Sequence, residues 1–438
     1  MTYDLLGIGL GPFNLGLAAL CHDIPALSTA FIEQKENFDW HPGLLLPGAR
    51  LQVPFYADLV TLVRPQSPFS WFSFLQAKER LFRFGVQDNT FPLRREYNEY
   101  GKWVAGQLAD CWFGHRVIGV EYMNDKARYA VGVFDLKTGA CKMFHAKHLV
   151  IGIGSEPYWP DCAKPFSGLS VKEDQKLPVI FHAAHYLFNK PRLDGAKRLT
   201  IIGSGQSAAE IFQDTLNGSA DQTLSWFTRS PRFFPMEANP AAFELSSPDY
   251  REHFYRLPEA IKEFILAGQD SLYKGINAGL LSAIYERLYE RLLDNPADRT
   301  ALYPNCELKK ISIHPPEITC TFRHSDTQEI FQHVTDALIL ATGYKEKPPN
   351  FLSSIKERIN YLPNGKYDVS ENYSVTNDQS IFVQNADLHS HGFASADLSF
   401  GPYRNAVILN TILGYDHYRL EQRSTFQRFD GRTSPDRS

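Results

Sequence analysis

The sequence of 438 residues has no long apolar run and no excess of basic residues. No stretch approaches the roughly 20 apolar residues that span a bilayer, so we expect no membrane partner. The first residues, MTYDLLGIGLG, lack the basic and apolar regions of a signal peptide, which predicts a cytoplasmic protein. The net charge of −4 argues against general affinity for nucleic acid, which needs clustered basic side chains.

The cysteines are few and scattered. None belongs to a C-x-x-C pair, and no cluster of histidine and cysteine has the spacing of a zinc site, so we expect no bound metal. Scattered thiols are typical of a reducing compartment, where each packs as a small buried side chain. The six are Cys21, Cys111, Cys141, Cys162, Cys306 and Cys320.

A dinucleotide-binding pattern stands at the start of the chain. The apolar segment 5–8 leads into a glycine turn that contains Gly9, Gly11 and Pro12, and a helical pattern follows. A second apolar segment ends on Glu33, 24 residues after Gly9. In this arrangement backbone amides and the helix N-terminus hold a pyrophosphate, while the acid binds an unphosphorylated ribose. We therefore expect FAD at this loop.

Asn14 departs from the pattern, because the third glycine of the motif normally stands there. The asparagine indicates either a slightly opened turn or a side chain that contacts the ligand, and Asn14 is counted among the FAD-binding candidates. The alternative is that Asn14 only caps the helix.

A second copy of the pattern begins at residue 199 with LTIIGSGQSAAEIF. Arg229 stands 24 residues after Gly205, in the neighbourhood that Glu33 occupies in the first copy. An arginine binds the 2′-phosphate that an acid repels, so this copy predicts NADPH. The expected pyrophosphate contacts are Gly203, Gly205, Gln206 and Ser207.

Two further apolar strands end in small residues and proline-rich segments, in 148–160 and 336–350. Such strands carry the chain between two nucleotide domains, so linkers are expected near 155–165 and 343–350. The predicted fold is α/β, with two Rossmann-like domains, the NADP domain inserted into a discontinuous FAD domain, and a small helical substrate region. The expected bounds are 1–165 and 336–438 for the FAD domain, 166–247 and 297–335 for the NADP domain, and 248–296 for the helical region.

The helical region contains one clear amphipathic helix. In NAGLLSAIYERLYERLLDNP, leucine and isoleucine recur at i, i+4 spacing with charges between them, and Asn-Pro ends the pattern. This predicts a helix that faces a core. The apolar positions are Leu280, Ile284, Leu288 and Leu292.

The two glycine patterns belong to a longer series of motifs. Along the chain these are GIGLGPFNLGLAAL, FDWHPGLLLPGARLQV, DLVTLVRPQSPFSWFSFL, RREYNEYGKWVA, IIGSGQSAAEIF, ALILATGY and NADLHSHGFASADLSF. On these stretches the chain resembles the microbial N-hydroxylating flavoprotein monooxygenases, which oxidise ornithine, lysine or terminal diamines for hydroxamate siderophores. The motifs run from residue 3 to about residue 410, so the resemblance covers nearly the whole chain.

The resemblance implies the reaction and its cofactors, FAD and NADPH. NADPH reduces FAD, the reduced flavin takes up O2 to form a C4a-hydroperoxide, and an amine nitrogen attacks its distal oxygen. Oxidised NADP stays bound and protects the peroxide from water. The protein then contributes positioning and the exclusion of water.

The resemblance also assigns residues by position. Gln52 would lie near the flavin ring and the nicotinamide, and is the candidate catalytic residue. The segment that wraps the flavin would be Trp40, His41, Pro42 and Gly43. The segment that lines the passage between the cofactors would be Ala341, Thr342, Gly343 and Tyr344. The segment that returns to the isoalloxazine and the substrate would be Asp397, Leu398 and Ser399.

The substrate amine must be neutral to act as a nucleophile. A free amine with a pKa of about 10.4 is mostly protonated at pH 7, and supplying its neutral form costs about 4.6 kcal/mol. An apolar pocket that disfavours the ammonium ion offsets much of this cost, so no carboxylate base is required.

Three positions bear on the identity of the amine. In the amino-acid hydroxylases of the family, a lysine after the FSFL segment binds the substrate carboxylate, and Lys78 matches it. The ornithine enzymes have asparagines that hold the amino-acid head, and an ungapped placement puts Phe243 and Leu272 at those positions. Apolar side chains there would leave a zwitterionic head without partners. We therefore predict a diamine such as cadaverine or putrescine, with L-lysine or L-ornithine as the alternative.

Three other classes are compatible with two nucleotide patterns. A disulfide reductase needs a redox-active cysteine pair, whereas the nearest cysteines, Cys306 and Cys320, are separated by 13 residues. A Baeyer–Villiger or sulfur-oxidising monooxygenase shares the plan but not the GPFNL and WHPG stretches. A non-catalytic flavin sensor would bind FAD without amine-stimulated consumption of O2. The resemblance further implies a homo-oligomer, because relatives commonly form one.

Overall fold

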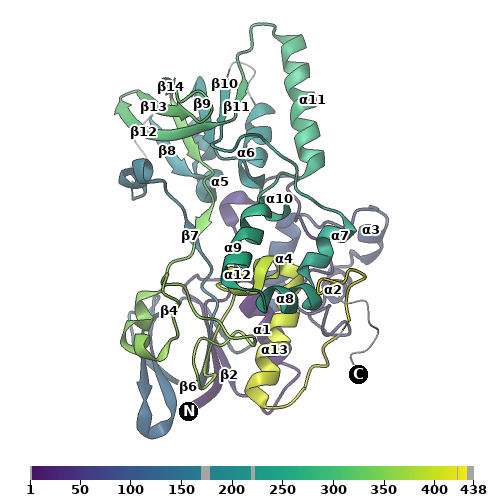
Figure 1. Cartoon of the computed structure of the whole chain (residues 1–438). Coiled ribbons are helices and arrows are strands. Elements are labelled where there is room, and N and C mark those ends of the chain that lie inside the picture. The colour runs from purple at the N-terminus through teal and green to yellow at the C-terminus, as the bar shows by residue number, and fades with distance from the viewer. Residues whose placement is uncertain (1, 169–177, 219–221, 422, 432–438) are drawn as a thin grey trace.

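The computed structural model describes residues 2–168, 178–218, 222–421 and 423–431. Two sheets form two lobes, which stand one above the other in Figure 1, and a group of short helices lies beside their junction. The N-terminal strand lies in the lower lobe, and the long helix α11 (Ala278–Asp294) rises along the upper one.

The lower sheet contains seven strands in the order β3-β2-β1-β6-β5-β4, with β17 paired to β6. β1 pairs in parallel with β2 and β6, and its buried run from Leu5 to Ile8 is apolar, as expected for a central parallel strand. β17 joins this sheet from the far end of the sequence, so the lower lobe is discontinuous. The strands are β1 (Thr2–Ile8), β2 (Thr29–Ile32), β3 (Cys111–Trp112), β4 (His115–Met123), β5 (Arg128–Asp135), β6 (Cys141–Ile151) and β17 (Ile381–Val383).

The upper sheet contains five parallel strands in the order β11-β10-β9-β15-β8, beside an antiparallel sheet of β12, β13 and β14. The five are β8 (Val179–His182), β9 (Arg198–Ile202), β10 (Thr223–Phe227), β11 (Ala301–Tyr303) and β15 (Ala337–Leu340). The antiparallel three are β12 (Cys306–His314), β13 (Glu317–His324) and β14 (Ile330–Thr335).

The chain crosses between the lobes twice at one place. β7 (Glu156–Pro157) leaves the lower lobe, β16 (Tyr344–Lys345) returns to it, and the two strands pair antiparallel. Both crossings fall within or directly beside the two predicted linkers. The upper lobe is therefore inserted into the lower one, as the predicted fold class requires.

Two of the expected bounds need correction. Residues from 336 onward were assigned to the first domain, but β15 pairs with β8 and β9 in the upper sheet. The four residues of β15 are fully buried between these neighbours, and the chain leaves the upper lobe only after them. Within 248–296, α11 packs on the upper lobe: Ile284 is fully buried in the upper core, while Leu292 at the end of the stripe is half exposed.

The remaining helices cover the sheets or fill the junction. α1 packs against α13 on the lower lobe, and α6 follows β9 in the upper lobe. They are α1 (Pro12–Cys21), α2 (Trp71–Ala77), α3 (Leu81–Gly85), α4 (Arg94–Ala105), α5 (Tyr186–Asn189), α6 (Gln206–Leu216), α7 (Pro240–Phe243), α8 (Pro248–Tyr255), α9 (Glu259–Gly268), α10 (Asp270–Tyr273), α12 (Leu388–His391) and α13 (Gly401–Leu413). No helix in the described ranges has the length and apolar character needed to cross a membrane.

Candidate active site

The first glycine turn lies between β1 and α1 and leaves a space beside its backbone. Gly9 has a φ of +83°, and a Cβ there would lie 2.6 Å from the carbonyl oxygen of Gly152, so only glycine fits. At Gly11, by contrast, a Cβ would have no neighbour within 4 Å. Gly11 is also the N-cap of α1 and brings no side chain to the first backbone amides of the helix. These amides border open space, so the turn fits an anionic pyrophosphate.

Glu33 lies directly after β2 and closes this turn from the side. One oxygen of its carboxylate accepts the N–H of Leu10 at 2.8 Å, and the other accepts the N–H of Lys35 at 2.9 Å. The carboxylate is thereby held at the edge of the glycine turn. This is the position from which an acid can reach a ribose hydroxyl.

Asn14 is fully buried. Its Nδ2 donates to the carbonyl oxygen of Gly9 at 2.7 Å and lies 3.4 Å from those of Ile8 and Val150. The side chain joins the ends of β1 and β6. Contact between Asn14 and the ligand stays a prediction, whereas the cap alternative is wrong, because Gly11 is the N-cap and no side chain caps α1.

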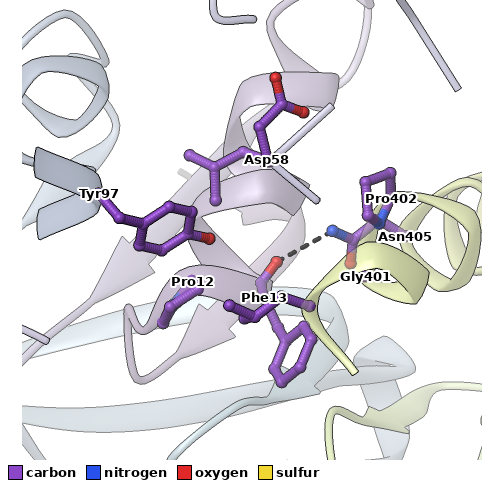
Figure 2. A pocket seen from close by; sticks show the side chains of 9 residues that line it. Pro12, Phe13, Asp58, Tyr97, Gly401, Pro402 and Asn405 are labelled. Atoms are coloured by element: carbon purple, nitrogen blue, oxygen red, sulfur yellow. Dashed lines mark hydrogen bonds between the residues drawn. The ribbon is translucent and has the colours of Figure 1, made fainter. Parts of the chain in front are cut away.

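A buried amide network holds α13 against the first turn. Asn405 donates to the carbonyl oxygen of Phe13 at 3.0 Å, which is the dashed line in Figure 2. Gln384, just after β17, donates to Asn405 at 2.6 Å and lies 3.3 Å from the oxygen of Asn14. The network fixes the turn with respect to both β17 and α13. The sequence patterns did not indicate Gln384 or Asn405, because neither belongs to a glycine motif.

A small cavity lies beside the turn and is lined by residues from four parts of the chain (Figure 2). The hydroxyl of Tyr97 points toward its centre and, within the part of the chain that the structure describes, has no hydrogen-bond partner. A buried polar atom without a partner is costly, which suits a site that a polar ligand completes. The lining residues are Pro12, Phe13, Asp58, Leu59, Tyr97, Leu398, Gly401, Pro402 and Asn405.

Asp58, another lining residue of this cavity, is a structural carboxylate. It is almost fully buried and accepts hydrogen bonds from the backbone of Val60, Thr61 and Trp71 and from the hydroxyl of Thr61. Burial raises its pKa. Its acceptor positions are taken up by the segment 58–71, so Asp58 shapes the cavity and is not a free base.

The second glycine turn packs against the strand that returns from the upper lobe. Gly203 has a φ of +134°, and a Cβ there would lie 2.1 Å from the carbonyl oxygen of Ala341. Gly205 is the N-cap of α6, as Gly11 is of α1, and neither glycine brings a side chain to the first amides of its helix. Gln206 and Ser207 begin α6. The turn therefore repeats the anion-binding geometry of the first one.

Arg229 lies two residues after β10, beside the second turn. The next residue, Ser230, has its hydroxyl 3.1 Å from that of Ser204 in the turn. Arg229 is exposed, and no salt bridge to it is found among the described residues. A phosphate on the ribose of a nucleotide at this turn would be within the neighbourhood of its guanidinium group.

The WHPG segment joins the lobes. A Cβ at Gly43 would lie 2.1 Å from the carbonyl oxygen of Ala184 in the upper lobe, so Gly43 permits a close backbone contact. Leu44, Leu46 and Ala49 belong to the core of the upper lobe. Gly43 thus makes a contact between the lobes, and the role expected for the segment, wrapping the flavin, stays a prediction.

Aromatic rings meet where the two chain crossings pass. Tyr344 lies between His41 and His182, with ring centroids 5.5 Å and 5.6 Å away. His182 accepts the N–H of Ala184 at Nδ1, so its Nε2 donates to the carbonyl oxygen of Gly343 at 3.1 Å. Burial lowers the pKa of both histidines to about 4. Both rings are therefore neutral at pH 7.

Gln52 lines a larger cavity, of about 500 Å³, between segment 46–52 and helices α6 and α11. Its Nε2 lies 3.4 Å from Oε1 of Gln206 and 3.5 Å from the carbonyl oxygen of Gly275. The structure thus brings the candidate catalytic residue to the second glycine turn. Six amide side chains line the cavity: Gln52, Asn89, Gln206, Gln213, Asn217 and Asn277.

The expected substrate residues are not gathered around these cavities. Lys78, Phe243 and Leu272 line neither of them. Lys78 ends α2 and lies 3.4 Å from the carboxylate of Glu99, while Leu272 is buried in the helical region. Ser399 donates to Asp397 at 2.8 Å, next to Leu398 in the small cavity.

No group of three or more possible metal ligands lies within the described ranges.

Two sheets with parallel central strands, each with a glycine turn between a strand and the start of a helix, define a two-dinucleotide oxidoreductase. The chain belongs to the L-lysine 6-monooxygenase/L-ornithine 5-monooxygenase family, whose sequence profile matches residues 1–346. It is similar to the putrescine N-hydroxylase of Shewanella oneidensis, with 41% identity over 98% of this chain and 84% of that protein. It is also similar to the alcaligin biosynthesis enzyme of Bordetella pertussis, with 41% identity over 98% of this chain and 91% of that protein.

A solved structure extends the comparison to the fold. The FAD-bound cadaverine monooxygenase of the desferrioxamine pathway from Erwinia amylovora has 38% identity and a TM-score of 0.92, covering 100% of this chain and 99% of that one. The predictions of the family, the fold class, flavin-dependent N-hydroxylation and the cofactors FAD and NADPH are confirmed. The rival classes of disulfide reductase, ketone or sulfur oxygenase and flavin sensor are thereby set aside.

Proposed function

We propose that the protein hydroxylates one terminal amine of a short aliphatic diamine, cadaverine or putrescine, for the synthesis of a hydroxamate siderophore. The observation that carries the proposal is the 38–41% identity, over nearly the whole chain, to relatives named for putrescine and cadaverine. L-lysine N6- or L-ornithine N5-hydroxylation is the second candidate, because the family profile bears those names.

Both cofactors fit the residues that are present. FAD would be held by Gly9, Gly11 and Pro12, whose backbone borders open space, with Glu33 at its ribose and the hydroxyl of Tyr97 nearby. When bound and reduced, the flavin supplies the transfer of oxygen to the amine.

NADPH would be held at the second turn by the backbone of Gly203 and Gly205 and by the start of α6, with Arg229 at the 2′-phosphate. The ATGY segment 341–344 would then lie between the two cofactors, because Gly203 packs against Ala341. The other candidate contacts on this side are Gln206, Ser207, Thr342, Gly343 and Tyr344.

The surroundings of Gln52 favour the neutral form of an amine. The two carboxylates that line the cavity of Gln52 are both paired, Glu210 with Arg94 and Asp214 with Lys190. A free carboxylate would hold the ammonium form instead. Gln52 offers only neutral amide groups, so it can orient an amine without protonating it.

A diamine is also favoured by what Lys78 contacts. Its ammonium group lies 3.4 Å from Glu99, which also pairs with Arg80 at 2.7 Å. Lys78 is therefore already paired, whereas a carboxylate anchor for an amino acid needs a cation free to accept one. Phe243 and Leu272 add no polar partner for an α-amino acid head. These contacts support a substrate without a carboxylate.

The two lobes suggest revised domain bounds. We assign 2–158 and 344–431 to the FAD domain and the upper lobe to the NADP domain, with α11 included in the latter.

All six cysteines are free thiols, which favours a reducing compartment such as the cytoplasm. A homo-oligomer is retained as a proposal, and the mass of the purified protein in solution tests it.

The test of the function is formation of hydroxylamine from added amines in the presence of NADPH and O2. The proposal predicts product from cadaverine or putrescine and a matching stimulation of NADPH oxidation. NADPH oxidation without formation of hydroxylamine from cadaverine, putrescine, L-lysine or L-ornithine would overturn the proposal.

A further inference from the structure

A chain of hydrogen bonds connects the lower lobe to Gln52 through α6. Arg94, the first residue of α4, forms a bidentate pair with Glu210 of α6, with two N–O distances of 2.8 Å. Gln206 precedes Glu210 by one helical turn and donates its Nε2 to Glu210 at 2.9 Å. The Oε1 of Gln206 lies 3.4 Å from the Nε2 of Gln52. Four side chains from both lobes thus form one continuous path.

The charged pair at the start of this path is buried. The side chains of Arg94 and Glu210 are 11% and 5% exposed. A buried, bidentate pair has a fixed geometry, in contrast to the loose pairs of a protein surface. Arg94 also donates to the carbonyl oxygen of Leu44 at 3.0 Å, so the same guanidinium holds the segment that leads to Gln52.

The path has a direction, because its first members have only one hydrogen-bonding role each. A guanidinium can only donate, and an ionised carboxylate can only accept. Gln206 must therefore turn its NH2 group toward Glu210 and its oxygen away. The N–H of Asn277 donates to that oxygen at 2.8 Å, which fixes the same orientation independently.

The direction is transmitted to Gln52. Because Gln206 presents an oxygen, Gln52 must turn its NH2 group toward it, and this group also lies 3.5 Å from the carbonyl oxygen of Gly275. The oxygen of Gln52 then faces away from both. It is left as an acceptor for an N–H group of a bound reactant.

We infer that Arg94 and Glu210 are positioning residues for the reaction: acting through Gln206, they fix the amide of Gln52 so that its oxygen faces the reacting groups. The inference rests on the proposed function and on the position near the flavin ring and the nicotinamide that the family resemblance implies for Gln52. The sequence indicated Gln52 and Gln206 only as separate contacts, and gave no sign that a buried ion pair joins the two lobes behind them.

The test begins with Glu210→Gln, which replaces an acceptor by an amide that can present either group to Gln206. We expect the fraction of oxidised NADPH recovered as hydroxylamine to fall, and kcat for product to fall about tenfold. The matched control is Asp298→Asn, which breaks another buried pair of the upper lobe, with Arg291 at 2.8 Å. Among the described residues, Asp298 has no hydrogen bond to the path, so its variant reports the loss of a buried pair alone.

A double-variant comparison separates positioning from general damage. If Glu210 acts through Gln52, combining Glu210→Gln with Gln52→Leu lowers the product fraction no further than Gln52→Leu alone. Arg94→Lys, which keeps the charge but loses the bidentate geometry, provides a second variant if Glu210→Gln does not fold. Effects that multiply, or a Glu210→Gln enzyme equal to the Asp298→Asn control, would overturn the inference.

The rate of flavin reduction by NADPH is measured in the same variants from the absorbance of the flavin, with no amine present. The inference predicts that it too slows in Glu210→Gln relative to the control. If no amine yields hydroxylamine, the proposed function fails. The positioning role of Arg94 and Glu210 is still decided in that case, by the rate of flavin reduction.

Discussion

Gly43 lies directly against the carbonyl oxygen of Ala184, so that a Cβ on Gly43 would be 2.1 Å from that oxygen. Gly43 follows the lower lobe's β2 in sequence, whereas Ala184 follows β8 of the upper lobe. Since both partners are backbone, neither can move aside as a flexible side chain would. Together with the packing of Leu44 in the upper core, this contact limits how closely the segment leading to Gln52 approaches the NADP domain.

Gly43→Ala is expected to destabilise the protein by about 1–3 kcal/mol, because the added methyl group overpacks a backbone contact. The product recovered per NADPH is expected to fall as well, since the lobes are pushed apart. Thermal unfolding and product assays measure the two effects. Gly119→Ala, where a Cβ has no neighbour within 4 Å, is the control. Equal behaviour of the two variants would refute the role of this contact.

Arg229→Ala is expected to raise KM for NADPH by about 10- to 100-fold, because a charge-assisted contact to the 2′-phosphate contributes roughly 1.5–3 kcal/mol. KM for NADH, which lacks this phosphate, is expected to stay the same. Steady-state kinetics with both nucleotides measures the ratio. An unchanged ratio of the two KM values would show that Arg229 does not read the phosphate.

The stability of the protein is expected to fall as the pH is lowered from about 6.5 to about 4. Burial lowers the pKa of His182 to about 4, whereas the unfolded chain protonates this ring near 6.5. The folded state binds the proton less readily than the unfolded chain. The contribution of His182 to the free energy of unfolding is therefore complete above pH 6.5 and is lost as the pH falls toward 4. It amounts to about 3 kcal/mol at most.

His41 and His391, with pKa values lowered to about 4 and about 3, act in the same direction. Unfolding in denaturant at several pH values measures the slope. His182→Gln is expected to show a shallower loss than the wild type, while His314→Gln, on an exposed position of β12, is expected to match it. An identical slope in His182→Gln would contradict this assignment.

Asn14→Asp is expected to cost about 3 kcal/mol or more and to lower the FAD content of the purified protein. The new carboxylate would face three carbonyl oxygens that now surround the amide of Asn14, at 2.7 to 3.4 Å. Flavin content and thermal unfolding measure the effect. Asn37→Asp, at an exposed position, is the control. Full FAD content with unchanged stability would show that the amide does not hold the turn.

Much of the fold could be predicted because glycine turns are local. Gly9 and Gly203 each need a positive φ and a close backbone neighbour, so their patterns are visible in a few consecutive residues. The placement of β15 in the upper sheet could not be predicted in the same way. An apolar strand pairs according to its neighbours in space, and the sequence does not show which sheet surrounds it.

The site was predicted less completely, because its supports are distant in sequence. Arg94 and Glu210 are 116 residues apart, and Gln384 and Asn14 are 370 apart. Neither pairing leaves a periodic pattern. Asn14 was identified as unusual from the motif, but its role in joining strand ends depends on the position of β6. Lys78 matched a motif position, while its contact with Glu99 comes from the packing of α2 against α4.

Whether the substrate is a diamine is decided by kcat/KM for hydroxylamine formation with cadaverine, putrescine, L-lysine and L-ornithine at saturating NADPH. We expect kcat/KM for cadaverine or putrescine to exceed that for both amino acids by about tenfold or more, equivalent to about 1.4 kcal/mol. A higher kcat/KM for lysine or ornithine than for either diamine would contradict it.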